Sequence, residues 1–169
     1  MRNYMMMAAL LLAASMAFTA CGGSDDDNDN GGSSAKNVIT IGTTDYDILT
    51  TYAYHPVSRP NNVYLAFLGN GLTYDATKYI PSGKGPYLAF QIYMTSTDNW
   101  TSLVPGKYTL INGLCASDYS ASTPSYGDYS LSGEVTIAKS GTLYTITFTG
   151  SYNGANIKAT YKGGMPIYL

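Results

Sequence analysis

Few residues in this 169-residue chain have side chains that could do catalytic chemistry. His55 is the only histidine, and Pro56 follows it directly. A Ser-His-Asp triad needs a histidine that activates a serine, but the sequence contains no Gly-x-Ser-x-Gly turn to present one. We therefore interpret His55-Pro56 as the end of a strand, and we predict that the protein is not an enzyme.

Metal and carboxylate chemistry have equally little support in the sequence. Zinc sites use paired cysteines or closely spaced histidines, and neither pattern occurs. Asp45 and Asp47 could offer oxygen ligands to Ca²⁺, although an exposed polar strand end explains them more simply. Glu134 falls on the polar side of an alternating segment, which does not suit the paired carboxylates of glycoside hydrolysis. No phosphate-binding or dinucleotide-binding glycine motif is present, so we predict no metal and no cofactor.

Cys21 ends a segment with the layout of an export signal. Arg2 supplies a positive charge, and residues 5–17 form an uncharged apolar run. That run is shorter than the roughly 20 apolar residues that a membrane-spanning helix needs, and Gly-Gly-Ser follows the cysteine instead of a cluster of Lys and Arg. We therefore predict that residues 1–20 are a cleaved signal peptide.

The small residue Ala20 immediately before Cys21 makes the end of this segment resemble the processing site of a bacterial lipoprotein. The resemblance implies that the Cys21 sulfur receives a diacylglyceryl group and that cleavage leaves Cys21 as the mature N-terminus. Phe18 departs from the family pattern, which usually has leucine there, and an ordinary secretory signal that ends near a cysteine is the alternative. Two acyl chains give stable anchoring. We therefore expect the lipid on Cys21 to hold the protein at the membrane.

The next segment, residues 22–34, contains glycine, serine, asparagine and aspartate but no apolar residue. Such a composition cannot form a core, and its like charges repel, so we predict that residues 21–35 are the lipidated cysteine and a flexible acidic tether. Acidic residues just after a lipidated cysteine also resemble the export signal of surface lipoproteins in the Bacteroidetes group. That resemblance implies a lipid-anchored protein of the outer membrane, exposed at the cell surface.

The remaining residues, 36–169, are nearly neutral. The chain has 11 acidic and 9 basic residues, but four of the acids lie in the tether and Arg2 lies in the signal, which leaves seven acids and eight bases. No basic stripe typical of nucleic-acid binding is present, so we predict no nucleic-acid partner. If Cys21 carries lipid, Cys115 has no partner for a disulfide bond, and we expect it to be a small buried residue.

Residues 36–169 are predicted to be a single β domain, because Tyr, Thr, Ile and Val dominate while Gly, Asn, Asp and Pro interrupt them. We expect strands at 38–41, 48–54, 63–68, 72–79, 87–94 and 107–111, and an antiparallel three-stranded meander over residues 131–161. Asn70-Gly71 predicts a tight hairpin turn, and residues 81–86 predict a loop. Alternation places Leu88, Phe90, Ile92 and Met94 in the core, with Tyr87, Ala89, Gln91 and Tyr93 on the opposite face.

About nine short strands without helices favour an all-β fold, an antiparallel two-sheet β-sandwich of 8–9 strands. An up-and-down β-barrel with a central pocket is the alternative, because apolar and polar residues alternate along the strands of both folds in the same way. The segments Gly-Glu-Val-Thr-Ile and Tyr-Thr-Ile-Thr-Phe-Thr-Gly within residues 130–163 resemble the closing meander of many small Bacteroidetes lipoproteins. That resemblance implies a compartment and a β-fold but no activity.

Tyrosine is unusually frequent, since sixteen follow Cys21, compared with three phenylalanines and one tryptophan. β-propensity and a solvent-facing sheet are one explanation. The other is an aromatic platform for glycans or for a partner protein. Its predicted members are Trp100, Tyr87 and Tyr93 on the outer strand face, and Tyr119 and Tyr126 in a long loop expected over residues 112–128.

Together these features predict a membrane-anchored cell-surface lipoprotein that acts as a non-catalytic binding or adhesion module. Its expected partner, besides the membrane, is a polysaccharide or a surface protein. A structural component of the envelope or of a pilus-like assembly is a second hypothesis, which predicts an edge strand able to pair with another chain. A β-barrel that binds a small apolar ligand is the third.

Overall fold

The computed structural model describes residues 36–59, 61–75, 80–94, 101–120 and 130–168. Within these ranges the chain forms eleven β-strands and no helix, which confirms the all-β prediction. The predicted signal peptide and tether, with Cys21, lie outside the described residues, and so do Trp100 and Tyr126. No helix with the length and apolarity of a membrane span occurs in the described ranges.

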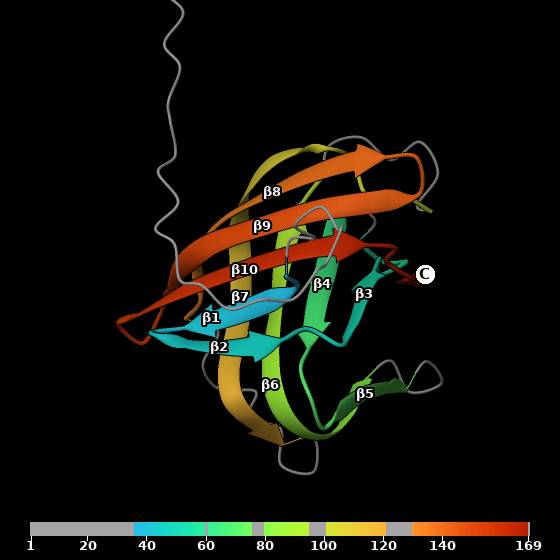
Figure 1. Cartoon of the computed structure of the whole chain (residues 1–169). Coiled ribbons are helices and arrows are strands. Elements are labelled where there is room, and N and C mark those ends of the chain that lie inside the picture. The colour runs from blue at the N-terminus through green and yellow to red at the C-terminus, as the bar shows by residue number, and fades with distance from the viewer. Residues whose placement is uncertain (1–35, 60, 76–79, 95–100, 121–129, 169) are drawn as a thin grey trace, which may run out of the picture. The chain divides into compact units, whose positions relative to one another are not determined.

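Figure 1 labels the strands in chain order. The first six are β1 (Val38–Ile41), β2 (Thr44–Asp47), β3 (Thr50–Tyr54), β4 (Asn62–Leu68), β5 (Leu72–Asp75) and β6 (Ile80–Tyr93). The other five are β7 (Gly106–Ser120), β8 (Ser132–Ser140), β9 (Leu143–Tyr152), β10 (Ala155–Gly163) and β11 (Ile167–Tyr168). β-branched and aromatic residues, which fit a pleated and half-buried surface, are frequent in most of them.

The strands form one open, mixed sheet in the order β11-β3-β4-β6-β7-β8-β9-β10-β1-β2, and β5 pairs with β6 beside this path. Every pair is antiparallel except β11–β3, which is parallel. In the described residues the path ends at β11 and β2, which do not pair with each other, so the up-and-down barrel is wrong. The strands outnumber the predicted 8–9 partly because the sequence pattern does not reveal the short edge strands β2 and β11.

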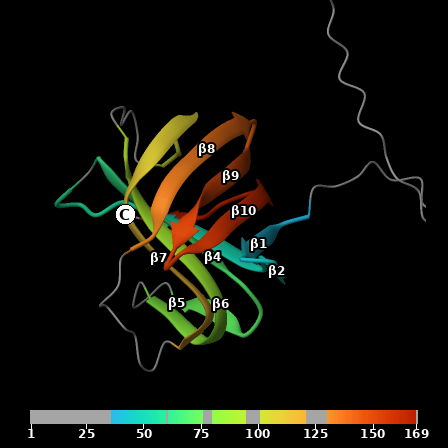
Figure 2. The ribbon, with the colours of Figure 1, turned by 90° about the vertical axis from the view of Figure 1, so that its left-hand side faces the viewer.

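β7 belongs to two parts of this sheet. Its residues 106–109 pair with β8, whereas the residues from Leu110 onward pair with β6. We call β8, β9, β10, β1 and β2 the meander half, and β11, β3, β4, β5 and β6 the hairpin half. Figure 1 shows the meander half crossing in front of β7, β6 and β4, and Figure 2 shows the same strands from the side. Side chains from both halves form one continuous core, which we call the shared core.

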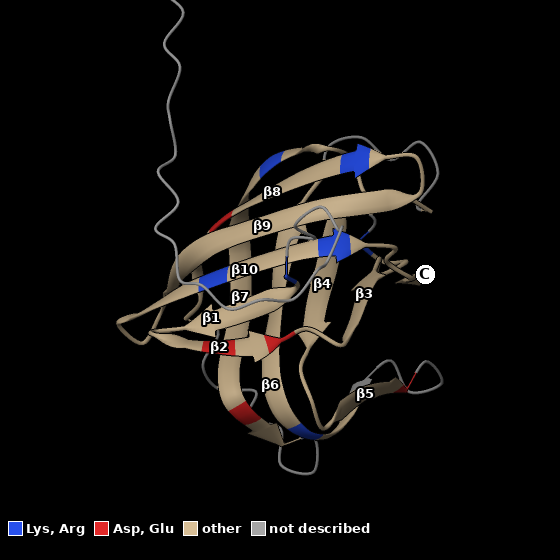
Figure 3. Cartoon of the chain, in the orientation of Figure 1, with Lys and Arg blue, Asp and Glu red and all other residues tan. Residues whose placement is uncertain are grey.

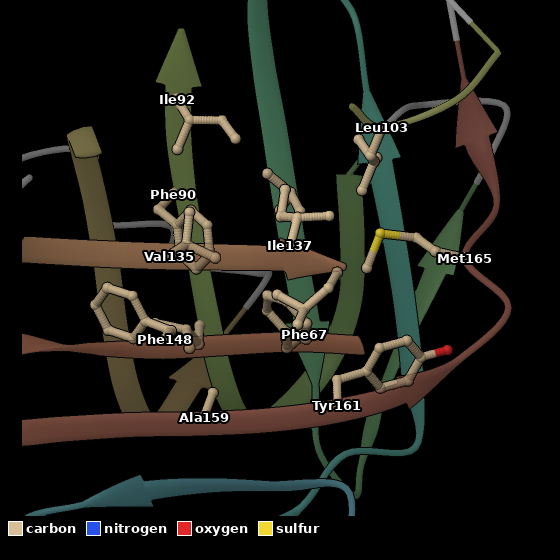
Figure 4. Packing of buried hydrophobic residues seen from close by; sticks show 14 of the residues in the cluster. Phe67, Phe90, Ile92, Leu103, Val135, Ile137, Phe148, Ala159, Tyr161 and Met165 are labelled. Atoms are coloured by element: carbon tan, nitrogen blue, oxygen red, sulfur yellow. The ribbon is translucent and has the colours of Figure 1, made fainter. Parts of the chain in front are cut away.

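Large apolar side chains fill the shared core (Figure 4). Phe90 of β6 stacks on Phe148 of β9 with ring centroids 5.1 Å apart, and Phe67 of β4 meets Tyr161 of β10 edge-on at 6.0 Å. The predicted core residues Leu88, Phe90, Ile92 and Met94 are all buried here, so that prediction is confirmed. Burial of each such side chain contributes about 1.5–3 kcal/mol, so the two halves depend on this core for much of their stability.

The predicted C-terminal meander is confirmed as β8, β9 and β10. One parity of each strand enters the shared core, as Val135, Ile146 and Ile157 do, and most residues of the other parity are exposed. The turn from β9 to β10 uses Asn153 and Gly154, both with positive φ (49° and 79°), which is typical of a tight hairpin turn. The pattern is legible here because one face packs and the other meets water.

The hairpin turn predicted at Asn70-Gly71 and the loop predicted at residues 81–86 are both wrong. Leu68 pairs with Tyr87, and Leu72 pairs with Gly83, so the same number of residues separates the two pairs on each strand. β4 and β5 are therefore two parts of one strand that runs alongside β6 in unchanged register. The whole predicted loop belongs to β6.

Glycines explain why this strand kinks instead of turning back. A Cβ atom on Gly71 would lie 2.2 Å from the carbonyl oxygen of Lys84, and one on Gly83 would lie 2.2 Å from the carbonyl oxygen of Gly71. Both glycines have positive φ (88° and 95°), which other residues adopt only with strain. The two backbones can thus approach closely and bend. Beyond the bend, Tyr74 of β5 stacks on Tyr52 of β3, with ring centroids 3.8 Å apart.

The long loop expected over residues 112–128 is wrong for its first part, because β7 extends to Ser120. Leu114 pairs with Ala89, so this segment continues the ladder between β6 and β7. The last residues of β7 are polar and partly exposed, and the sequence therefore does not show that the strand continues. Residues 121–129 lie outside the described part of the chain.

The strand predicted at residues 48–54 begins later, at Thr50. The two residues before it cross from the meander half to the hairpin half. The Ile48 N–H donates to the Asn37 carbonyl at 3.0 Å, and the Leu49 N–H donates to the Leu68 carbonyl at 2.9 Å. Ile48 is thus hydrogen-bonded next to β1 of the meander half, and Leu49 is hydrogen-bonded to β4 of the hairpin half. These two bonds join the two halves where the chain passes from one to the other.

The first described strand, β1, is paired along both edges, with β10 and with β2. Just before it, the Asn37 side chain accepts a hydrogen bond from the Lys162 N–H at 2.7 Å and donates one to the Lys162 carbonyl at 3.3 Å. Lys36 forms an ion pair with Asp47 at 3.0 Å. The residues leading into the sheet are therefore held by both neighbours of β1.

Candidate functional site

Tyrosines gather on the face of the hairpin half that points away from the shared core. On β4 the residues Val63, Leu65 and Phe67 enter the core, so the side chains between them point to the opposite, outer face. The register of β3, β6 and β7 with their neighbours places residues of matching parity on the same face. The tyrosines there are Tyr52, Tyr54, Tyr64, Tyr74, Tyr87, Tyr93, Tyr119 and Tyr168.

Five of these residues form what we call the tyrosine cluster: Tyr52, Tyr74, Tyr87, Tyr119 and Tyr168. Tyr74 contacts Tyr52 and Tyr168, with ring centroids 3.8 Å and 5.0 Å away. Tyr87 contacts Tyr119 at 4.6 Å. Together with neighbouring leucine and alanine side chains these rings form a second, smaller hydrophobic core on the outer face. This second core joins β5, which lies beyond the bend, to β3.

The hydroxyl groups of the tyrosine cluster also interact. Burial raises the pKa of Tyr52 above its usual value, a hydrogen bond with Tyr87 lowers it, and the nearby Tyr119 raises it. Tyr87 itself is only 8% exposed. The structure thus brings together two of the predicted site residues, Tyr87 and Tyr119, but Tyr87 lies beneath the surface and supports it from within.

A more polar row of side chains lies beside the tyrosine cluster. Register places Tyr54 opposite Tyr64, Tyr64 opposite Gln91, and Gln91 opposite Asn112, so β3, β4, β6 and β7 each contribute one side chain. Tyr93, two residues after Gln91 on β6, stands diagonally from Tyr64 on the same face. We call these five residues the amide–tyrosine surface.

Two hydrogen bonds fix the orientation of this surface. Asn112 Nδ2 donates to Gln91 Oε1 at 3.0 Å, and Asn61 Nδ2 donates to the Tyr93 hydroxyl at 3.0 Å. Gln91 is only 3% exposed, whereas Tyr93 is 52% exposed. Tyr54, Tyr64 and Asn112 are half-buried. The surface therefore combines accessible aromatic rings with an amide that a buried neighbour holds in place.

Sequence reasoning identified only one member of the amide–tyrosine surface as a site residue, Tyr93. It missed Tyr54, Tyr64, Gln91 and Asn112 as site residues. The available signal was the alternation over residues 87–94, which put Gln91 on the same outer face as Tyr93. Nothing in the sequence joins that strand to the other members, because strand neighbours and register depend on long-range pairing.

The described centre of this outer face carries no charged side chain. β3, β4, residues 87–93 and residues 110–117 contain no Asp, Glu, Lys or Arg, and β3 and β4 are free of charge in Figure 3. Farther along the hairpin, Lys84 and Asp118 pair with each other at 2.9 Å. The five side chains of the amide–tyrosine surface are therefore uncharged and have no charged neighbour within these segments.

The side chains considered for catalysis lie apart from this surface. His55 is buried just after β3, where its backbone N–H donates to the Tyr168 carbonyl at 2.9 Å. Asp45 accepts a hydrogen bond from Thr40 at 2.8 Å, and Asp47 pairs with Lys36. Glu134 lies on the exposed face of β8 and pairs with Lys107 at 2.7 Å. Among the residues that the structure describes, no three His, Cys, Asp or Glu side chains cluster as a metal site would require.

Cys115 is buried in the shared core, which confirms the expectation from the sequence. Burial raises the pKa of its thiol to about 12. The thiol is therefore protonated at neutral pH, and only the thiolate is a good nucleophile or metal ligand. Cys115 acts as a small apolar side chain in the interior.

Comparison of the chain with protein-family models, with curated proteins and with solved structures finds no match.

Proposed function

We propose that this protein is a lipoprotein anchored in the outer membrane at the cell surface, and that its β domain is a non-catalytic binding module for glycans. The observation that carries the binding role is the amide–tyrosine surface, which presents one exposed and two half-buried tyrosine rings and an oriented amide on one neutral face. The anchor is proposed from residues 1–35, which combine an apolar signal, Cys21 after Ala20, and an acidic tether.

Tyrosine rings and amide groups suit glycan binding for different reasons. A tyrosine ring offers a flat apolar surface with a polar tip, which fits the C–H face of a sugar ring. An amide offers both donors and an acceptor to sugar hydroxyls. Side chains that are already oriented lose little conformational freedom on binding. The described outer face of the meander half lacks this combination, because threonine, serine and lysine dominate it.

The sheet edges favour this proposal over a structural role in an envelope or pilus-like assembly. Such a role needs an edge strand that a second chain can extend. The described strand order ends at β2 and β11, and β5 lies beside it. These three strands are short, with four, two and four residues. β2 also carries Asp45 and Asp47, and short, charged edges disfavour strand addition.

We further propose that the two halves of the sheet pack face to face as the two layers of a β-sandwich. Both halves contribute side chains to the shared core, and β7 passes from one half to the other, as strands that switch sheets do at the corners of sandwiches. The shared core is filled with large apolar side chains, and the sheet is open in the described residues. A barrel that encloses a small ligand therefore has no support.

The anchor is tested with the full chain in intact cells of a Bacteroidetes host. A labelled fatty acid should be incorporated into the wild type and not into Cys21→Ala, and protease added outside the cells should digest the wild type. Absence of label in the wild type would overturn the anchor. Label without digestion would overturn exposure at the cell surface.

The binding role is tested by titration calorimetry of the full-length protein in detergent against a panel of polysaccharides. Saturable binding to a member of the panel, weakened in Tyr93→Ala, is the expected result, with Thr147→Val on β9 as the control that binds like the wild type. Trp100→Ala tests in the same titration whether Trp100, which stays a prediction, contributes. No binding by any polysaccharide would overturn the glycan-binding role.

A further inference from the structure

We infer that the amide–tyrosine surface binds an uncharged polysaccharide chain that lies across β3, β4, β6 and β7, with Asn112 as its main hydrogen-bonding residue and Gln91 as the residue that positions Asn112. This inference rests on the proposed binding function. It adds the chemical class of the ligand, the direction in which it crosses the strands, and separate roles for two amides.

The charge of the surface selects the ligand class. Uronic acids and sulfated sugars are recognised through Arg or Lys, which form strong charge-assisted hydrogen bonds with anions. Cationic amino sugars would need carboxylates. Neither kind of side chain occurs in β3, in β4, in residues 87–93 of β6 or in residues 110–117 of β7. Farther along these strands, Lys84 of β6 pairs with Asp118 of β7. Neutral hydroxyl groups are the chemistry that uncharged amides and tyrosines match.

The burial of Gln91 has a specific explanation in this arrangement. A buried amide costs free energy unless it is hydrogen-bonded. The neighbouring row of the same face avoids this cost, because Ala66, Ala89 and Leu114 occupy it. Gln91 accepts one hydrogen from Asn112 Nδ2 and thereby fixes the Asn112 amide plane. The second N–H of Asn112 and its carbonyl oxygen form no other hydrogen bond in the described structure, so one donor and one acceptor are oriented on a half-buried residue.

The arrangement of the rings indicates an extended ligand. Neighbouring strands lie about 4.8 Å apart, so the row from Tyr54 on β3 to Asn112 on β7 spans roughly 14 Å. That is the length of a short oligosaccharide rather than of a single sugar. Tyr64 and Tyr93 stand between these ends on adjacent strands, and the Tyr93 ring is held by Asn61. A chain of sugar rings laid across the strands would contact each of them in turn.

The test uses titration calorimetry of the full-length protein in detergent with a neutral glucan, a neutral mannan, polygalacturonate and a sulfated glycan. We expect saturable binding of a neutral polysaccharide that changes little between 50 and 500 mM salt. Asn112→Ala and Tyr93→Ala should each weaken it about tenfold. Thr147→Val is the matched control, because it changes an exposed side chain on the outer face of the other half.

A double-mutant cycle separates positioning from simple structural support. If Gln91 acts through Asn112, Gln91→Leu should weaken binding about as much as Asn112→Ala, and the double variant should bind no more weakly than Asn112→Ala alone. Unfolding midpoints establish that each variant is folded. If Gln91→Leu does not fold, Asn112→Ala and Tyr93→Ala, which change more accessible side chains, decide the outcome.

Three results would overturn the inference, and they differ in what they say about the proposed function. Binding of a neutral polysaccharide with the same affinity in all variants would place the site elsewhere and leave the binding function standing. Binding only of the anionic polysaccharides would refute the ligand class while the binding function stands. No binding of either class would overturn both.

Discussion

The two halves of the sheet bury one face in the same core but differ in the use of the other face. In the meander half, Thr136, Thr147 and Thr160 stand side by side across β8, β9 and β10 on a face that meets water. In the hairpin half, the outer face carries tyrosines and amides, and part of it forms a second core with β5. A wet second face leaves a clear alternation in the sequence. A second face covered by the same chain weakens it, as in β4, where the last four residues are all buried.

The largest effect should come from removing a side chain on which both halves depend. Phe148→Ala should lower the free energy of unfolding by about 3–5 kcal/mol, because Phe148 of the meander half is buried against Phe90 of the hairpin half. Urea unfolding followed by both circular dichroism and tyrosine fluorescence measures it. One shifted transition in both signals is expected. Two separate transitions would show that the halves differ in stability as well as in surface.

The next effect should be confined to the hairpin half. Gly71→Ala should cost about 2 kcal/mol or more, because its Cβ atom would overlap the Lys84 carbonyl and its φ is positive. Gly164→Ala is the control, since a Cβ atom there meets nothing within 4 Å, and it should change stability by less than about 0.5 kcal/mol. Equal costs in thermal unfolding would contradict the kink as a glycine-dependent feature.

Stability at alkaline pH should depend on a group on the inner face of the sheet. The folded pKa of Cys115, about 12, exceeds the unfolded value of about 8.5. The stabilisation that the protonated Cys115 thiol gives to the folded state is fully present below about pH 8.5. Above that the unfolded state releases the proton first, so the free energy of unfolding falls as pH rises toward 12, by about 1 kcal/mol per pH unit. Burial raises the pKa of Tyr52 as well, which adds a fall of the same sign.

Unfolding of Cys115→Ala between pH 8 and 10.5 isolates this contribution, because the substitution removes the titrating group. The fall should be shallower in the variant than in the wild type. An identical pH dependence in both proteins would show that Cys115 titrates alike in the folded and unfolded states.

The smallest effect should come from the wet face. Thr147→Val keeps a β-branched side chain at an exposed position of β9, so the free energy of unfolding should change by less than about 0.5 kcal/mol. Chemical denaturation measures this change. A loss above 1 kcal/mol would mean that the threonine row is a packed feature, and the contrast between the two outer faces would then be smaller than the structure indicates.

The parts of the fold that could be predicted from the sequence are those in which neighbouring residues meet different environments. Ile146 and Phe148 alternate with exposed threonines, and Phe90 and Ile92 alternate with residues on the outer face of β6. Both patterns therefore indicate which side of the strand faces the core. The turn at Asn153-Gly154 could be predicted because it needs only local backbone geometry.

The parts that could not be predicted depend on distant residues. Asn70-Gly71 has the composition of a hairpin turn, yet the strand continues because β6 stays paired on both sides of it. Likewise Gln91 and Asn112 form a pair only through the register of β6 and β7. Local residue preferences hold at both places, but long-range pairing decides what those residues do.

The double-sided pairing of β1 gives the domain a defined response to mechanical load. A pull on the chain ahead of residue 36 reaches the ion pair of Lys36 with Asp47 and the hydrogen bonds of Asn37 to Lys162 before it reaches β1. The ladders of β1 with β10 and β2 would then be loaded together. For force directed along the strand, those bonds are sheared in parallel rather than opened one after another. A domain tethered at this point and bound to a ligand in flow would therefore resist detachment of its first strand.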